Sequence, residues 1–571
     1  PSNGDSLIVP GHVKSWPSGE ETFVRGTILA YPTDKLDIRA KLTYSKSKIE
    51  GGSATVGQRI DCPSGIAQGG QPYFPCVANR DVYTGGAPES IMKLIPGTRS
   101  LNGLGFRDNR QILATLEANY ALTDGVQLTS VTGLFDFDEF NAHNATGAPS
   151  ARVMVPFLPF EQKQLTQEFR VSSDWSSPVN FMSGVFFEGK DTEASQDAVI
   201  SFTEATAFQI GTETMMEEQS AFSAFAEIRW AITDNFDLSG GLRYTTEDKD
   251  LNVFRNSIDL TSNLTADSVS FSNVSREITG SYSPSDSSLL FASYKEGFKS
   301  GGFDGGFSGG GVSVPGYDNH YGEELVDGFE AGYKTNINNR LALNITAYNY
   351  QYDDLQVGAY DPATISFKIR NAAEATVRGI ESDINWITPV EGISLQGSLA
   401  YNQAKFDEFS TGCYVGQSPA NGCNMTPNPT TGAFQEQDLS GTTMHGAPEV
   451  VATTGLQYLK TFSNGFGFDA YLGATYSDEY TTNLRRSPQD YQESFVKVNS
   501  TLKVTSPTES WDVALVVRNM TDKVTLNTTG GVTLTGGGTG TNSAFLGDRS
   551  GWVSYGREIF LNLNYRFAQD F

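Results

Sequence analysis

The chain has 571 residues, including 59 glycines, and a formal net charge of −26. This acid excess argues against a nucleic-acid-binding protein, because such proteins draw much of their affinity from basic patches. No apolar run approaches the about 18 consecutive residues that a membrane-spanning helix requires. We expect the acidic residues to lie on surface loops and to keep the protein soluble. The alternative is a surface that binds divalent cations or faces a cation-bridged lipopolysaccharide layer.

Segments of about ten residues with strict apolar–polar alternation recur along the whole chain, and no long segment shows helical spacing of apolar residues. They predict an all-β protein with about nineteen strands visible. In chain order the strands are expected to begin near Thr22, Leu36, Gln111, Val126, Gln162, Val179, Ser220, Phe236, Val269, Ser288, Glu324, Arg340, Thr376, Ile393, Glu449, Gly465, Glu493, Trp511 and Trp552.

The connections between these strands alternate in length. After the odd strands they are short, as at residues 32–35 and 123–125, whereas after the even strands they are usually long, as at residues 47–109 and 407–448. Tight periplasmic turns and long outer loops are typical of a transmembrane antiparallel β-barrel. A soluble sandwich or propeller has no reason to keep this pattern.

The final strand shows the two faces that such a barrel requires. Ile559, Leu561 and Leu563 fall on one face, whereas the other face is polar except for Phe560. In lipid every backbone polar group must be paired internally, so the sheet closes on itself and its outer face is apolar.

The first recognisable strand leads into a short turn and therefore runs from the outside to the periplasm. A single-chain bacterial barrel is expected to begin in the periplasm and to have an even number of strands. We therefore expect an odd number of N-terminal strands to be absent from this sequence. There is also no segment that resembles a signal peptide.

Several segments resemble TonB-dependent outer-membrane receptors. In family order they are residues 167–174, 238–248, 289–303, 323–356, 370–386, 516–523 and 555–567. The resemblance implies a barrel of about 22 strands around an N-terminal plug. Residues 1–571 would then form one barrel domain, incomplete at its N-terminus, without the first three strands, the plug domain and the TonB box.

The resemblance also implies a function and a location. A receptor of this kind lies in the bacterial outer membrane among lipid and lipopolysaccharide, and it takes up a scarce solute actively when the inner-membrane TonB complex pulls on the plug. The expected solute is a ferric siderophore or another metal chelate. Two alternatives stay open, namely a passive outer-membrane channel or porin, and a structural barrel that anchors a surface partner.

Catalysis finds no support in the sequence. The four histidines, His12, His143, His320 and His445, do not occur in HExxH, and none lies beside a GxSxG motif. We therefore expect no catalytic residues, no cofactor and no metal site, and the protein is not expected to be an enzyme.

A glycine-rich loop at residues 299–324 is the strongest candidate for ligand binding. Its glycines allow close folding of the backbone, and the aromatic residues are expected to line a ligand mouth. These residues are Phe303, Phe307, Tyr317, His320 and Tyr321. The alternative is a loop whose aromatic residues pack on neighbouring loops.

Two arginines in a second outer loop, Arg485 and Arg486, are further candidates, because arginine pairs well with the carboxylates or catecholates of a ferric siderophore. They would equally suit lipopolysaccharide phosphate, or simply face water.

The four cysteines form two close pairs, Cys62 with Cys76 and Cys413 with Cys423, in segments rich in glycine, proline and asparagine. The spacing differs from the CxxC spacing of zinc sites. Two short-loop disulfides in an oxidising compartment are expected, with free or metal-binding thiols as the alternative.

Overall fold

The computed structural model describes residues 18–50, 58–68, 76–79, 105–142, 153–201, 208–256, 262–303, 320–361, 366–427, 432, 434–532 and 535–567. Nineteen long strands form the main sheet. They are β1 (Ser18–Thr33), β2 (Leu36–Glu50), β4 (Phe106–Thr123), β5 (Val126–Ala142), β6 (Val153–Ser173), β7 (Val179–Ser201), β8 (Phe208–Thr233), β9 (Phe236–Asn256), β10 (Ser262–Ser285), β11 (Ser288–Lys299), β14 (Glu324–Ile337), β15 (Leu341–Asp361), β16 (Ser366–Ile387), β17 (Ile393–Gly412), β20 (Val450–Thr461), β21 (Gly467–Ser477), β24 (Phe495–Thr505), β25 (Trp511–Arg518) and β28 (Glu558–Tyr565).

Short elements lie in the long outer loops. They are β3 (Gln58–Asp61), β12 (Gly302–Phe303), β13 (His320–Tyr321), β18 (Met425–Pro427), β19 (Phe434–Asp438), β22 (Tyr480–Thr481), β23 (Tyr491–Gln492), β26 (Leu526–Gly531), β27 (Arg549–Val553) and two single-turn 3₁₀ helices, Pro419–Asn421 and Gly540–Asn542. No helix in the described ranges is long and apolar enough to cross a membrane.

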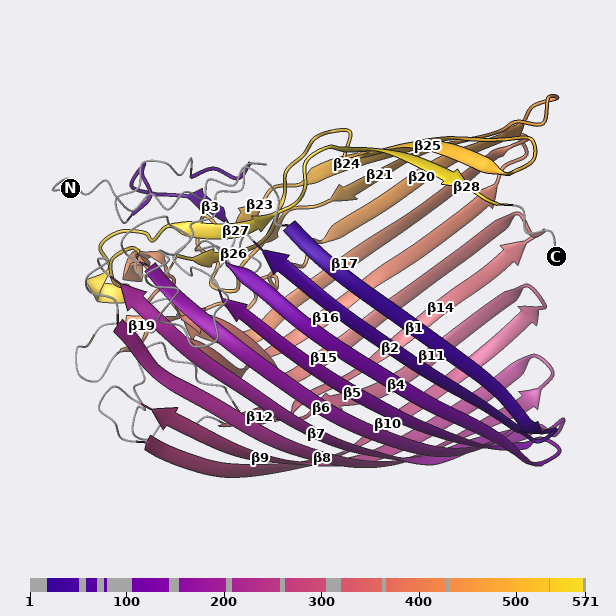
Figure 1. Cartoon of the computed structure of the whole chain (residues 1–571), viewed down its shortest axis with the longest axis horizontal. Helices are drawn as coiled ribbons and strands as arrows, with labels where there is room; N and C mark the ends of the chain where they lie inside the picture. Colours follow the sequence, from indigo (N-terminus) through magenta and orange to yellow (C-terminus); the bar gives the residue numbers. More distant parts are fainter. Residues whose placement is uncertain are drawn as a thin grey trace.

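Each long strand pairs antiparallel with its neighbour in the chain, and the sheet rolls around an axis, with the early strands in front of the later ones in Figure 1. The sheet has 21 strands, of which β18 and β19 belong to an outer loop, so the predicted nineteen barrel strands are confirmed. Short turns gather at one end and long loops at the other. Within the described residues β1 pairs only with β2, and β28 only with β25.

Several predicted strand boundaries are wrong at the outer end. Strands β6, β8 and β10 begin at Val153, Phe208 and Ser262, well before the predicted positions. These extensions project beyond the apolar band, where no lipid selects apolar residues on alternate positions, so the sequence pattern fades before the strand ends.

The final strand, expected from Trp552, is in fact two elements. Trp552 belongs to β27, which turns away to pair with β3 and β26, and β28 begins only at Glu558. The close approach of these loop strands explains a glycine at position 551, since a Cβ there would lie 3.0 Å from Ile60 Cδ1.

The two faces of β28 have the expected character. Leu561 and Leu563 are 74% and 72% exposed on the outward face. On the inward face, the ring of Phe560 lies under the guanidinium of Arg518, 5.3 Å from its centroid. An exposed apolar band around a sheet of this kind is the surface that meets lipid.

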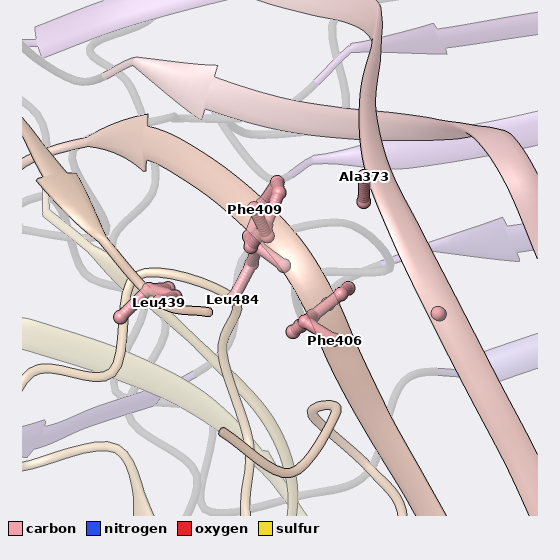
Figure 2. Close-up of a cluster of buried hydrophobic side chains, with 6 residues drawn as sticks. Ala373, Phe406, Phe409, Leu439 and Leu484 are labelled. Carbon is pink, nitrogen blue, oxygen red and sulfur yellow. The ribbon is translucent and has the colours of Figure 1, made fainter. Parts of the chain in front are cut away.

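Buried apolar clusters lie where outer loops fold onto the inward face of the sheet. Among the described residues, the largest joins Ala373, Ala375, Phe406 and Phe409 of β16 and β17 to Leu439 and Leu484 of two loops (Figure 2). The rings of Phe406 and Phe409 stack with centroids 4.3 Å apart. Burial of each large apolar side chain contributes about 1.5–3 kcal/mol, so these loops are firmly docked against the wall.

Candidate functional site

The glycine-rich loop begins and ends in a small hairpin, β12–β13, that folds inward onto β9. Phe303 is only 6% exposed and packs against Leu251 and Val253. Its side chain therefore belongs to the docking contact of the hairpin, not to an open ligand surface.

Lys249 of β9 anchors the base of this hairpin. Its Nζ donates to Gly301 O at 2.7 Å and to Ser300 Oγ at 3.2 Å, and lies 2.9 Å from Glu247 Oε1. A largely buried ammonium with three oxygen partners fixes the position of the loop that follows.

His320 and Tyr321 lie on β13, which pairs with β12. His320 Nε2 lies 2.7 Å from Asp267 Oδ2, and its ring packs 5.4 Å from that of Phe303. His320 remains 39% exposed at its side chain, so of these residues it is best placed to contact a solute at the mouth. Phe307 and Tyr317 lie outside the described residues.

The two candidate arginines are held among the outer loops, which here form a cluster of contacting loops. Arg485 Nη1 donates to Cys413 O at 3.4 Å, and Arg486 Nη1 donates to Thr443 O at 2.6 Å. Burial lowers the pKa of Arg486. Both guanidinium groups thus help to tie the loop of residues 478–494 to the loop of residues 413–449.

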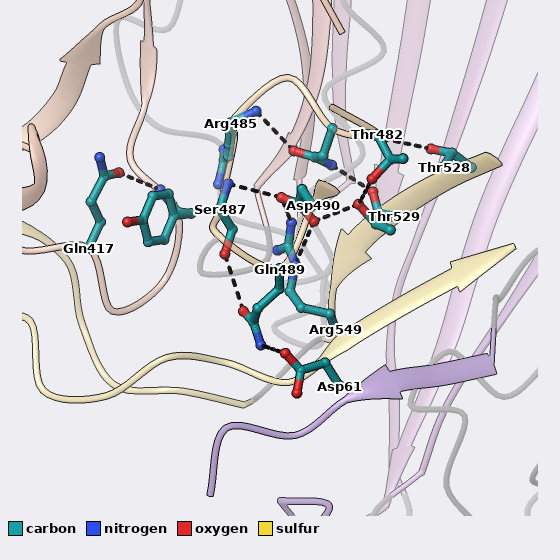
Figure 3. A network of polar contacts seen from close by, with 12 residues as sticks. Asp61, Gln417, Thr482, Arg485, Ser487, Gln489, Asp490, Thr528, Thr529 and Arg549 are labelled. Atoms are coloured by element: carbon teal, nitrogen blue, oxygen red, sulfur yellow. Dashed lines mark hydrogen bonds and ion pairs between the residues drawn. The ribbon is translucent and has the colours of Figure 1, made fainter. Parts of the chain in front are cut away.

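A polar network links the outer loops to one another (Figure 3). Asp490 and Arg549 form a buried ion pair, with Arg549 Nε donating to Asp490 Oδ1 at 2.9 Å, and Thr529 Oγ1 donates to the same oxygen. Gln489 Nε2 donates to Asp61 Oδ2 at 2.8 Å. The network connects loops from the beginning and the end of the chain.

A second buried ion pair lies beside this network. Arg59 Nη1 lies 3.1 Å from Asp548 Oδ2, and both side chains are almost inaccessible. Burial lowers the pKa of Arg59 and raises the pKa of Asp548. Because unpaired charges are costly in such a place, the pair holds β3 against the last outer loop.

The cysteines pair in these same loops. Cys62 is bonded to Cys76, with a Cα–Cα distance of 5.5 Å, and Cys413 to Cys423, with 5.7 Å. A disulfide across such a short loop restricts the unfolded chain and stabilises the loop by about 2–4 kcal/mol.

An aromatic patch on the inward face of β5 and β6 was not predicted from the sequence. Phe135 and Phe137 stack with centroids 6.1 Å apart, and Phe160 meets Phe137 edge-on at 6.0 Å. All three rings are partly exposed. The signal was present, because Phe135 and Phe137 alternate with Leu134 and therefore face away from lipid.

Polar side chains surround this aromatic patch. Gln164 Nε2 donates to Glu188 Oε2 at 2.9 Å, and Arg107 pairs with Glu139 at 2.8 Å. Asn141 is 6% exposed, and its Oδ1 atom has no hydrogen-bond partner among the residues that the structure describes. Flat apolar rings beside amides and charged groups form a surface suited to a planar polar solute.

The main sheet has nineteen long antiparallel strands and an apolar outer band, with short turns at one end and interlocked loops at the other. These features define an outer-membrane β-barrel. The model of the family described as TonB dependent receptor-like, beta-barrel matches residues 73–520. The chain therefore belongs to the TonB-dependent receptor β-barrel family, as the sequence resemblance indicated. Members of this family lie in the bacterial outer membrane and act as receptors and transporters, which confirms the predicted location and class of protein.

Solved structures of the same fold include three outer-membrane-type receptors. The ferric yersiniabactin uptake receptor FyuA from Yersinia pestis has a TM-score of 0.71 at 13% identity, over 96% of this chain and 71% of that one. The siderophore receptor PiuA from Acinetobacter baumannii has 0.67 at 14%, over 96% and 74%. The ferric-catecholate import receptor Fiu from E. coli has 0.65 at 13%, over 96% and 75%. No curated protein sequence matches the chain.

Proposed function

We propose that this protein imports a ferric siderophore or a similar metal chelate through the outer membrane, with energy from the inner-membrane TonB complex. Family membership supports TonB-dependent transport. The aromatic patch of Phe135, Phe137 and Phe160 supports the solute class, because ring faces beside amides and an Arg–Glu pair suit a planar, polar chelate.

The patch faces inward on the wall of β5 and β6, and the anchored β12–β13 hairpin lies on the inward face of β9. The solute would bind to this wall and contact His320 as it enters. Arg485 and Arg486 would act indirectly in this proposal, by holding the neighbouring loops in place.

The binding step is tested on purified protein with a panel of ferric siderophores, by quenching of tryptophan fluorescence. Tight, saturable binding of one chelate is expected. Joint substitution of Phe135 and Phe137 by alanine should weaken binding at least about tenfold, since each ring contributes about 1 kcal/mol of contact energy. Phe187→Ala, on the outward face, is the matched control and should bind as the unmodified protein does.

TonB dependence requires a plug domain with a TonB box, which we propose for the native polypeptide. Peptide mapping of the protein purified from outer membranes tests this directly. Peptides that precede Pro1 and match a plug sequence are expected. A native chain without a plug, and without a separate plug subunit, would favour a passive channel.

A further inference from the structure

One inward-facing row of residues joins the aromatic patch to the β12–β13 hairpin. Phe135 of β5 is directly opposite Gln164 of β6, and Gln164 is opposite Lys190 of β7. Lys190 is in turn opposite Gln219 of β8, which is opposite Lys249 of β9. Directly opposed residues of antiparallel strands project to the same face. Lys190 therefore lies on the inward face, between the aromatic patch and the lysine that anchors the hairpin.

The carboxylate that follows Lys190 on the same face of β7 is engaged by neutral groups. This residue is Glu188, two positions away along the strand. Its Oε2 accepts a hydrogen bond from Gln164 Nε2 at 2.9 Å, and its Oε1 accepts one from Gln219 Nε2 at 3.4 Å. The two glutamines that flank Lys190 thus both donate to Glu188, and each oxygen of this carboxylate has a partner that carries no charge.

Lys190 itself has no hydrogen bond and no ion pair within the described part of the chain, and its side chain is partly exposed. Glu217, two residues before Gln219 on β8, forms no ion pair with it there either. The lysine at the end of the row differs, because Lys249 Nζ lies 2.9 Å from Glu247 Oε1. Lys190 thus keeps its ammonium available on the inward wall.

The position of this ammonium indicates what it contacts. In a chain with a net charge of −26, an ammonium without a counter-ion is a local site for an external anion. Neighbouring strands lie about 4.8 Å apart, so the backbones of Lys190 and Phe135 are separated by about 10 Å. A solute whose aromatic ring carries anionic oxygens spans this gap, with its ring against Phe135 and an oxygen at Lys190 Nζ.

We propose that Lys190 selects the charge of the imported solute, by binding an anionic oxygen of a chelate whose ring stacks on the aromatic patch. This inference rests on the proposed function and narrows its solute class to anionic aromatic chelates. A neutral chelate of the same shape gains the ring contact alone, whereas the anionic one also gains the charge-assisted hydrogen bond. Gln164 and Gln219 serve this selection because they hold Glu188 and leave the ammonium free.

The test compares two chelates of similar shape on the full native chain in detergent, by quenching of tryptophan fluorescence. One is a trianionic ferric tris-catecholate, and the other is a ferric tris-hydroxypyridinone, which has similar planar rings and no net charge. The anionic complex should bind at least about tenfold more tightly. Equal affinities, or tighter binding of the neutral complex, would overturn the inference. This comparison does not depend on the folding of a variant.

Three variants assign the preference to Lys190. Lys190→Met should lose the preference and bind the neutral complex as the unmodified protein does, whereas Lys190→Arg, which keeps the charge, should retain it. The matched control is Lys503→Met, since Lys503 lies near the turn end of β24, 3.7 Å from Asp469, and this variant should also retain it. An unchanged preference in Lys190→Met would contradict the assignment.

Failure of this inference can be distinguished from failure of the proposed function. If the tris-catecholate does not bind but another ferric siderophore of the wider panel does, charge selection by Lys190 is refuted and import of a chelate still stands. If no ferric chelate binds, both proposals fall together.

Discussion

Arg518 of β25 places its guanidinium carbon 5.3 Å from the ring centroid of Phe560 on β28. The two residues lie on adjacent strands, in the pairs Arg518 with Glu558 and Val516 with Phe560, which follow one another on the same face of the sheet. Phe560 is the single apolar side chain on an otherwise polar face, and the contact explains its presence. An aromatic ring on the inward face gives a cation a partner without placing a further charge there.

Substitution of Phe560 by leucine should therefore weaken the last strand pair. A cation–π contact that is partly exposed contributes about 0.5–1 kcal/mol. The free energy of unfolding is measured in detergent with urea for Phe560→Leu, for Arg518→Met and for the double variant. The loss of stability in the double variant should differ from the sum of the two single losses by an amount of that size. Strictly additive effects would contradict the account.

The buried pair of Asp490 and Arg549 should be essential to the loop cluster. Asp490→Asn leaves Arg549 buried without a counter-charge, which costs about 3–5 kcal/mol. We expect the loops of residues 478–494 and 545–553 to become sensitive to limited proteolysis while the barrel stays intact. The control is Arg276→Gln at an exposed pair, where a loss of about 0–1 kcal/mol is expected. Equal protease resistance of Asp490→Asn and the unmodified protein would refute the role of the pair.

Lys249 should control the β12–β13 hairpin. Lys249→Met removes the donor to Gly301 O and leaves Glu247 without its cation, so residues 300–303 and 320–324 should exchange amide protons faster. Lys299→Met, an exposed lysine beside the same hairpin, is the control and should leave exchange unchanged. Equal exchange in both variants would mean that the apolar contact of Phe303 alone docks the hairpin.

Much of the barrel could be predicted from the sequence because lipid imposes a period of two on every strand that crosses it. The apolar positions of β28 and the short turns after the odd strands carried that signal directly. The boundary at Trp552 could not be predicted, because β27 lies only a few residues before β28 and only its pairing with β3, from the opposite end of the chain, removes it from the wall.

The contacts of the outer loops were harder to predict, because the loops lie outside the lipid and their sequences carry no regular apolar period. The sequence alone does not distinguish an aromatic residue that binds a solute from one that docks a loop. Phe303 docks the hairpin against Leu251. Arg485 and Arg486 are likewise engaged by carbonyl groups of loops distant in sequence. The aromatic patch at Phe135 could have been recognised, since its alternation places it opposite the lipid face.

The most direct test of the central claim is uptake of radiolabelled ferric siderophore by iron-starved cells that express the complete native protein. Energised, saturable uptake is expected, lost when the gene is deleted and equally lost when TonB is inactivated or the proton motive force is collapsed. Uptake that persists without TonB would contradict the account and identify the barrel as a passive channel.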